Sequence, residues 1–117
     1  MPLNDAEEAL PYTTIGTDEA KRMIEAGTRV IDVRRPDEWN RGHIREAELL
    51  PLDGIYAFGK ALKERDLSED EEVIFTCAVG QRSAVACEIA LLTGLKKVYN
   101  LANGINGWIG RRYPVER

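Results

Sequence analysis

The feature that most constrains the fold of this chain is a regular alternation of short apolar segments with helix-like segments. Runs rich in β-branched residues predict strands, whereas apolar residues at every third or fourth position predict helices. Strands are predicted at 13–15, 29–33, 47–52, 71–77 and 96–101. Helices are predicted at 18–26 with Thr17 as N-cap, 36–41, 53–65 and 82–92, and a short terminal helix follows the glycine-rich turn at 103–110. The alternation favours an α/β fold with a parallel sheet and helices on both faces.

The junction between the fourth strand and the helix after it is the place where chemistry is expected. Residues 73–75 form a continuous apolar run, which is typical of a strand buried on both faces. The segment 82–92 is apolar nearly all round, which predicts a buried helix that ends at Gly94. In parallel sheets of this kind the reactive site lies beyond the carboxyl ends of the strands.

Charge and composition exclude several classes of partner. The formal net charge is −4 and the isoelectric point is about 5.1, which argues against binding to nucleic acid or to an anionic membrane. No apolar stretch approaches the length of a membrane span. Residues 1–10, MPLNDAEEAL, lack the basic and apolar regions of a signal peptide. We therefore expect residues 1–12 to be a loose lead-in and residues 13–117 to form a single domain.

The two cysteines, Cys77 and Cys87, are too few for a disulfide framework. With a single histidine, His43, the chain offers no plausible zinc set, so no metal and no cofactor are expected. Free thiols of this kind fit a reducing, cytoplasmic location. Cys87 lies within the apolar helix and is interpreted as a packing residue.

Cys77 has a setting that favours a reactive thiolate. It comes at the end of the fourth strand and precedes the helix that begins near Arg82, so free backbone N–H groups and the positive end of the helix dipole should stabilise its anion. Both effects lower the pKa of a thiol. Gly80 allows the short loop to turn sharply, and the loop N–H groups can then converge above the sulfur as an anion nest.

Four motifs in order resemble the single-domain rhodanese sulfurtransferases. They are VIDVRRPDEWNRGHI (30–44), VIFTCAVGQRSAVAC (73–87), VYNLANGINGW (98–108) and YPV (113–115). The resemblance covers residues 13–115 and implies a five-stranded parallel sheet with flanking helices. It also implies that Cys77 carries sulfur as a persulfide. Residues 77–82 would then form the six-residue active-site loop of that family.

The resemblance implies an enzyme that moves sulfane sulfur from a donor, such as thiosulfate or an organic persulfide, to a thiophilic acceptor. The acceptor would be a thiol, cyanide or a carrier protein. An alternative is a persulfide carrier or binding module that works only within a sulfur-relay complex. A phosphatase is disfavoured, because the related cell-division phosphatases have one more residue between cysteine and arginine, and a phosphate needs a wider ring than one sulfur atom.

The sequence departs from the family pattern at two places. Arg45 and Glu46 replace a small apolar run, and Asn103 stands where a glycine is usual before Gly104. Because asparagine tolerates the left-handed conformation, we expect the geometry to survive. Ala78 and Val79 are small and apolar where some family members carry basic side chains, which leaves the donor open.

Several side chains around the predicted loop have two readings each. Arg82 either holds the anion or pairs with an acid, and Ser83 is expected to cap or bond within the first helical turn. Asp32 and Arg34 form an active-site ion pair, or Asp32 satisfies backbone N–H groups at the strand end. His43 is interpreted as structural. The remaining predicted active-site loop and substrate-binding residues are Ala78, Val79, Gly80 and Gln81, and a cluster of arginines either draws anionic donors or is merely solvated: Arg34, Arg35, Arg41 and Arg45.

Overall fold

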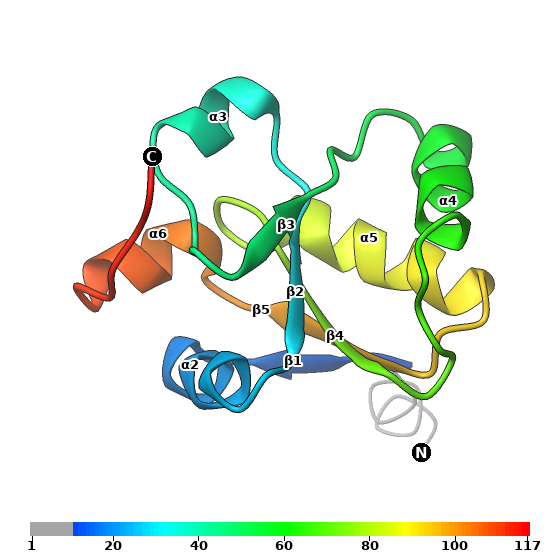
Figure 1. The fold of residues 1–117 in the computed structure, drawn as a ribbon, viewed down its shortest axis with the longest axis horizontal. Coiled ribbons are helices and arrows are strands. Elements are labelled where there is room, and N and C mark those ends of the chain that lie inside the picture. Colours follow the sequence, from blue (N-terminus) through cyan, green and yellow to red (C-terminus); the bar gives the residue numbers. More distant parts are fainter. Residues whose placement is uncertain (1–10) are drawn as a thin grey trace, which may run out of the picture.

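The computed structural model describes residues 11–117, and it confirms the predicted α/β fold (Figure 1). One parallel sheet has the strand order β1-β5-β4-β2-β3, so β4 lies at its centre. The strands are β1 (Thr13–Ile15), β2 (Arg29–Asp32), β3 (Ala47–Leu49), β4 (Glu72–Thr76) and β5 (Lys97–Leu101). Residues 1–10 of the predicted lead-in lie outside the described residues.

Helices cover both faces of this sheet. They are α2 (Thr17–Glu25), α3 (Pro36–Asn40), α4 (Ile55–Lys63), α5 (Gln81–Leu92) and α6 (Gly104–Gly110). One face packs against α4 and α5, and the other packs against α2 and α6 (Figure 1). The short α3 lies beyond the carboxyl end of β2, on the side of the sheet where a site is expected (Figure 1).

The central strand explains the continuous apolar run in the sequence. Val73 and Phe75 point into the core beneath α4 and α5, whereas Ile74 points into the core beneath α2 and α6. All three side chains are completely buried. Because both faces of β4 are covered, neither set of alternating positions is left for polar residues.

The boundaries differ from the predicted ones for local reasons. Gly16, and not Thr17, is the N-cap of α2, and Thr17 is instead buried within the first turn. Gly80 has a left-handed conformation with φ of 96° and serves as the N-cap of α5, so this helix begins one residue earlier than expected. The strand β3 ends at Leu49 rather than at 52, and α6 occupies the segment expected to be a turn.

Within residues 11–117, no helix is both long enough and apolar enough to cross a membrane.

The two faces of α4 provide a test of where the core lies. Phe58 is 1% exposed and meets Phe75 edge-on, with 6.3 Å between ring centroids, whereas Tyr56 is 93% exposed. We expect Phe58→Ala to lower the free energy of unfolding by about 3–5 kcal/mol, because it leaves a cavity in the core. The control Tyr56→Ala should change it by about 0.5 kcal/mol or less. Urea unfolding measures both, and equal losses would contradict the assignment of this face to the core.

Candidate active site

The Cys77 sulfur is enclosed by the loop that follows β4. The strand ends at Thr76, and Cys77 is only 1% exposed. Its Sγ accepts hydrogen bonds from the backbone N–H of Gly80 at 3.1 Å and from that of Ser83 at 3.3 Å. The Ser83 hydroxyl oxygen lies 3.3 Å from the same sulfur. The predicted convergence of loop N–H groups is present, and it is centred on Sγ itself.

Two carbonyl groups of the loop are held by hydrogen bonds from α6. The Cys77 carbonyl accepts a hydrogen bond from the Ile105 N–H at 2.8 Å, and the Ala78 carbonyl accepts one from the Asn106 N–H at 3.1 Å. The first turn of α6 therefore rests directly on the loop. The Ala78 carbonyl shares its peptide unit with the N–H of Val79, which is one of the groups that lower the pKa of Cys77.

Two glycines permit the close approach. A Cβ at Gly80 would lie 2.3 Å from the Ala102 carbonyl oxygen, and a Cβ at Gly104 would lie 2.3 Å from the Cys77 carbonyl oxygen. Both glycines also have positive φ, 96° and 54°. Asn103 has φ of −104°, so its tolerance of the left-handed conformation is not used, and Gly104 is the residue of this pair with a positive φ.

The two thiols of the chain have opposite electrostatic settings. Burial raises the pKa of Cys77, but hydrogen bonds from the Ser83 hydroxyl and from the N–H groups of Ser83, Gly80 and Val79 outweigh it, so the net pKa lies below the ordinary value. Burial also raises the pKa of Cys87, to about 12, and nearby Glu88 adds to the rise. Cys87 is completely buried among apolar neighbours, as its packing interpretation predicts.

Arg82 pairs with an acid, which is one of its two predicted roles. Its Nη1 and Nη2 donate to the two carboxylate oxygens of Glu38 at 2.7 and 2.9 Å. This bidentate contact ties the start of α5 to α3. The Arg82 guanidinium holds the pKa of Glu38 well below its usual range, at about 2, although burial opposes the shift. The sequence analysis missed Glu38, whose signal was an acid in the first turn of a helix that begins with Pro36.

Asp32 and Arg34 form an ion pair, and the predicted backbone role of Asp32 is present as well. The Arg34 Nε and Nη2 donate to the buried Asp32 carboxylate at 3.0 and 2.9 Å, and the Arg34 N–H donates to it at 3.0 Å. Arg34 also donates to the carbonyls of Glu38 and Gly42. These contacts fasten the end of β2 to α3 and to the turn after it.

Ser83 does not cap α5, and the prediction of a bond within its first turn was wrong for the side chain. Its hydroxyl instead donates to Oδ1 of Asn100, on β5, at 2.5 Å. Asn100 is buried, and its Nδ2 donates to the Gly80 carbonyl at 3.2 Å. The sequence analysis did not single out Asn100; its signal was a polar residue inside an otherwise apolar strand.

The other predicted residues lie around this centre or away from it. Val79 is 52% exposed, Gln81 is exposed and Ala78 is half-buried. His43 stacks on Trp39 with 3.6 Å between ring centroids, and its Nδ1 bonds to the Trp39 carbonyl, which fits its structural interpretation. The remaining arginines pair with surface carboxylates, Arg35 and Arg41 with Asp37 and Arg45 with Glu46.

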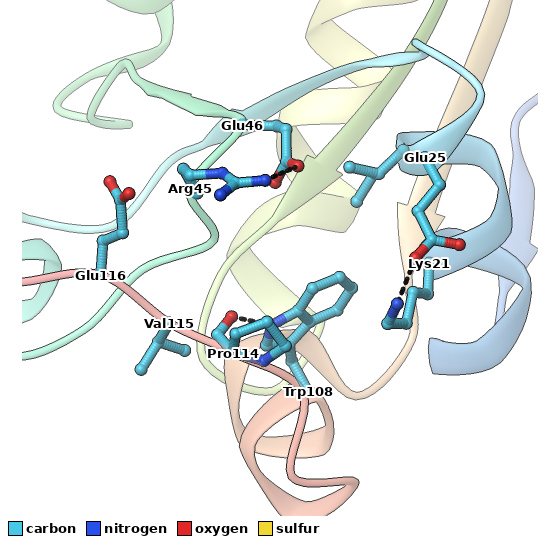
Figure 2. A pocket seen from close by; sticks show the side chains of 9 residues that line it. Lys21, Glu25, Arg45, Glu46, Trp108, Pro114, Val115 and Glu116 are labelled. Carbon is cyan, nitrogen blue, oxygen red and sulfur yellow. Dashed lines mark hydrogen bonds and ion pairs between the residues drawn. The ribbon is translucent and has the colours of Figure 1, made fainter.

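A separate pocket of about 190 Å³ opens between α2, α6 and the C-terminal segment (Figure 2). Its apolar floor includes Trp108, and its rim carries the Lys21–Glu25 and Arg45–Glu46 ion pairs. None of the predicted loop residues lines it. In the part of the chain that the structure describes, no group of three or more His, Cys, Asp or Glu side chains is arranged to hold a metal ion.

Residues 16–111 match the family described as the Rhodanese-like domain. The chain belongs to the rhodanese family. The thiosulfate sulfurtransferase 18 of Arabidopsis thaliana is 23% identical to it, over 97% of this chain and 90% of that protein. YrkF of Bacillus subtilis (strain 168), whose name proposes a sulfur-carrier role, is 26% identical over 92% of this chain and 57% of that protein.

The crystal structure of a rhodanese-related protein from Thermoplasma volcanium is similar throughout. It shares 33% sequence identity and a TM-score of 0.71, and the match covers 90% of this chain and 98% of that chain. The resemblance to the rhodanese family noted in the sequence is thereby confirmed, as is the fold that it implied.

The contact between α6 and the loop can be tested with one glycine substitution and a control in the same helix. We expect Gly104→Ala to destabilise the protein by at least about 1–2 kcal/mol from its left-handed backbone alone, and further by displacing the Cys77 carbonyl. Gly110→Ala, whose Cβ would meet nothing within 4 Å, should be neutral or slightly stabilising. Thermal unfolding checks both, and two similar melting temperatures would contradict the contact.

The acidity of Cys77 can be measured from the rate of its alkylation against pH. Because the loop hydrogen bonds favour the thiolate, the inflection should lie below the free-cysteine value of about 8.5. Mass spectrometry of the labelled peptides separates Cys77 from Cys87, which should react only after unfolding. An inflection for Cys77 at or above the free value would show that burial prevails over the hydrogen bonds.

Proposed function

We propose that this protein is a sulfurtransferase that moves sulfane sulfur from a donor to a thiophilic acceptor through a persulfide on Cys77. The observation that carries the proposal is the position of the Cys77 sulfur, which receives two backbone N–H groups at the start of a helix. Membership of the rhodanese family and the likeness to a thiosulfate sulfurtransferase support it.

The reaction runs in two displacements. The Cys77 thiolate attacks the outer sulfur of the donor, a new S–S bond forms, and the donor's own S–S bond breaks with its electron pair on the leaving group, which is sulfite for thiosulfate. An acceptor nucleophile, such as a thiol or cyanide, then attacks the outer sulfur and releases the Cys77 thiolate. The inward N–H groups of the loop stabilise the negative charge on sulfur at each stage.

The surroundings of the loop favour an organic persulfide over thiosulfate as the donor. Ala78 and Val79 carry no charge, and the Arg82 guanidinium is already bonded through both nitrogens to Glu38. A small dianion therefore meets backbone N–H groups and few uncommitted cations. The exposed side chain of Val79 offers an apolar surface on which the organic part of a persulfide can rest.

A second candidate is a persulfide carrier that delivers sulfur to a protein acceptor within one complex. The burial of Cys77 favours it, because a protein partner that shifts the loop would expose the sulfur only when docked. The similarity to a protein named for a sulfur-carrier role points the same way. Both candidates need a reduced thiol, and the two free cysteines fit a reducing compartment such as the cytoplasm.

Sulfur loading and turnover distinguish these candidates. After incubation with thiosulfate or glutathione persulfide, mass spectrometry should find one added sulfur on Cys77. We expect Cys77→Ser to abolish both loading and transfer to cyanide, and Cys87→Ser to keep most of each, because only the first thiol is acidic.

Loading without turnover on small acceptors would favour the carrier over the enzyme. Equal losses in the two variants would instead indicate a thiol pair and contradict a single nucleophile. Cys77-dependent hydrolysis of an aryl phosphate, without sulfur loading, would replace sulfur transfer by phosphatase chemistry.

A further inference from the structure

A continuous chain of hydrogen bonds runs from the Cys77 sulfur to the strand behind the loop. The sulfur lies 3.3 Å from the Ser83 hydroxyl, which lies 2.5 Å from Oδ1 of Asn100. The Nδ2 of Asn100 in turn lies 3.2 Å from the Gly80 carbonyl oxygen. This series of hydrogen bonds returns to the start of α5 at Gly80. The side chains of Cys77, Ser83 and Asn100 are all buried, which keeps the series away from bulk water.

The direction of each hydrogen bond follows from the last acceptor. The Gly80 carbonyl can only accept, so the amide of Asn100 must present its Nδ2 to it. The Oδ1 of Asn100 therefore faces Ser83, and because this oxygen can also only accept, Ser83 donates its single hydroxyl proton there as long as Cys77 is a neutral thiol. The orientation of Asn100 thus decides where the Ser83 proton lies.

This direction has opposite consequences for the two forms of Cys77. A neutral thiol donates its S–H to the lone pair of Ser83, and every group in the chain is satisfied. A thiolate has no proton to give and needs the hydroxyl proton of Ser83 instead. Asn100 then loses its hydrogen bond from Ser83, and two oxygen lone pairs face each other across the short gap between Ser83 and Asn100.

We propose that Asn100 is a positioning residue that competes with the Cys77 sulfur for the Ser83 hydroxyl proton and so restrains the ionisation of the thiol. The backbone N–H groups of the loop promote the thiolate, and Asn100 limits how far they do so. Once Sγ becomes neutral in a persulfide, the Ser83 hydroxyl again donates its hydrogen bond to Asn100. This inference rests on the proposed function only in taking Cys77 as the nucleophile.

Such a limit suits a sulfur that must both attack and leave. A thiol with a very low pKa is a poor nucleophile, and the most effective attacking thiol has a pKa near the ambient pH. The loop N–H groups alone can only lower the pKa of Cys77. A second group that opposes them keeps Cys77 nucleophilic in the first displacement while leaving it acidic enough to depart in the second.

The charged groups around Cys77 do not supply this control. Arg82 from α5 is neutralised by Glu38 from α3, and Asp32 on β2 is paired with Arg34. Cys87 on α5 has a pKa of about 12 and stays protonated. On β5, the element behind the loop, the side chain bonded to Ser83 is the uncharged Asn100.

A double-mutant cycle on the pH profile of Cys77 alkylation tests the inference. Asn100→Leu keeps the volume and removes the acceptor, so the Ser83 hydroxyl is freed to donate to the thiolate. We expect the inflection to fall by about one pH unit, the size of one hydrogen bond to a charged group. In the Ser83→Ala background the same substitution should move the inflection by less than about a third as much, because the hydroxyl through which Asn100 acts is gone.

An inflection that stays or rises in Asn100→Leu, or a fall that is equal in both backgrounds, would overturn the inference. Equal falls would mean that Asn100 acts through the Gly80 carbonyl and the loop backbone. Neither readout needs sulfur transfer, so a protein with no turnover and an intact cycle would refute the proposed function alone.

A second measurement applies if Asn100→Leu does not fold. In the native protein, the side-chain amide NMR resonances of Asn100 should shift with pH at the inflection of Cys77, because the loss of the Ser83 proton changes its hydrogen bonding. The shift should largely disappear in Ser83→Ala. Resonances that do not titrate, or a shift that is retained in full without the hydroxyl, would overturn the inference.

Discussion

The contact between the first turn of α6 and the carbonyl groups of Cys77 and Ala78 is the constraint on which the loop around Cys77 depends. A peptide unit presents its N–H and its C=O on opposite sides. A loop that points N–H groups at a sulfur therefore needs hydrogen-bond donors for its carbonyls elsewhere. Ile105 and Asn106 are those partners. Without them the carbonyl oxygens would be left without partners, and an inward turn of any of them would repel a thiolate.

A second layer of polar contacts fixes the loop from the other side. The Arg82–Glu38 pair joins the start of α5 to α3, and the buried Asp32–Arg34 pair joins α3 to the end of β2. Removing one partner from a buried pair leaves an uncompensated charge and costs about 3–5 kcal/mol. Arg82, for which the sequence left a role at the anion and a pairing with an acid open, links α5 to α3 through Glu38.

The sequence was sufficient for the elements whose signals are local. The apolar run at 73–75 and the nearly continuous apolar helix after it located the central strand and placed Cys77 at its carboxyl end. Glu38 and Asn100 were not foreseen, because each acts through a partner that is distant in the sequence, Arg82 in one case and Ser83 in the other. Local preference predicts a helix-cap role for Ser83, but its hydroxyl bonds across to Asn100 on β5 instead. Gly80 took the cap position instead, because its left-handed conformation is what turns the loop.

The order of the helices and strands along the chain has a consequence for how the protein is synthesised. The segment that receives the carbonyls of the Cys77 loop, at the start of α6, follows Cys77 in the chain by way of α5 and all of β5. A ribosome therefore releases the cysteine well before the α6 residues that bond to the loop carbonyls. Until α6 docks, the carbonyls of Cys77 and Ala78 lack the N–H partners that they have in the folded domain. The loop around Cys77 can therefore take its final shape only after the last helix of the sheet's cover has docked.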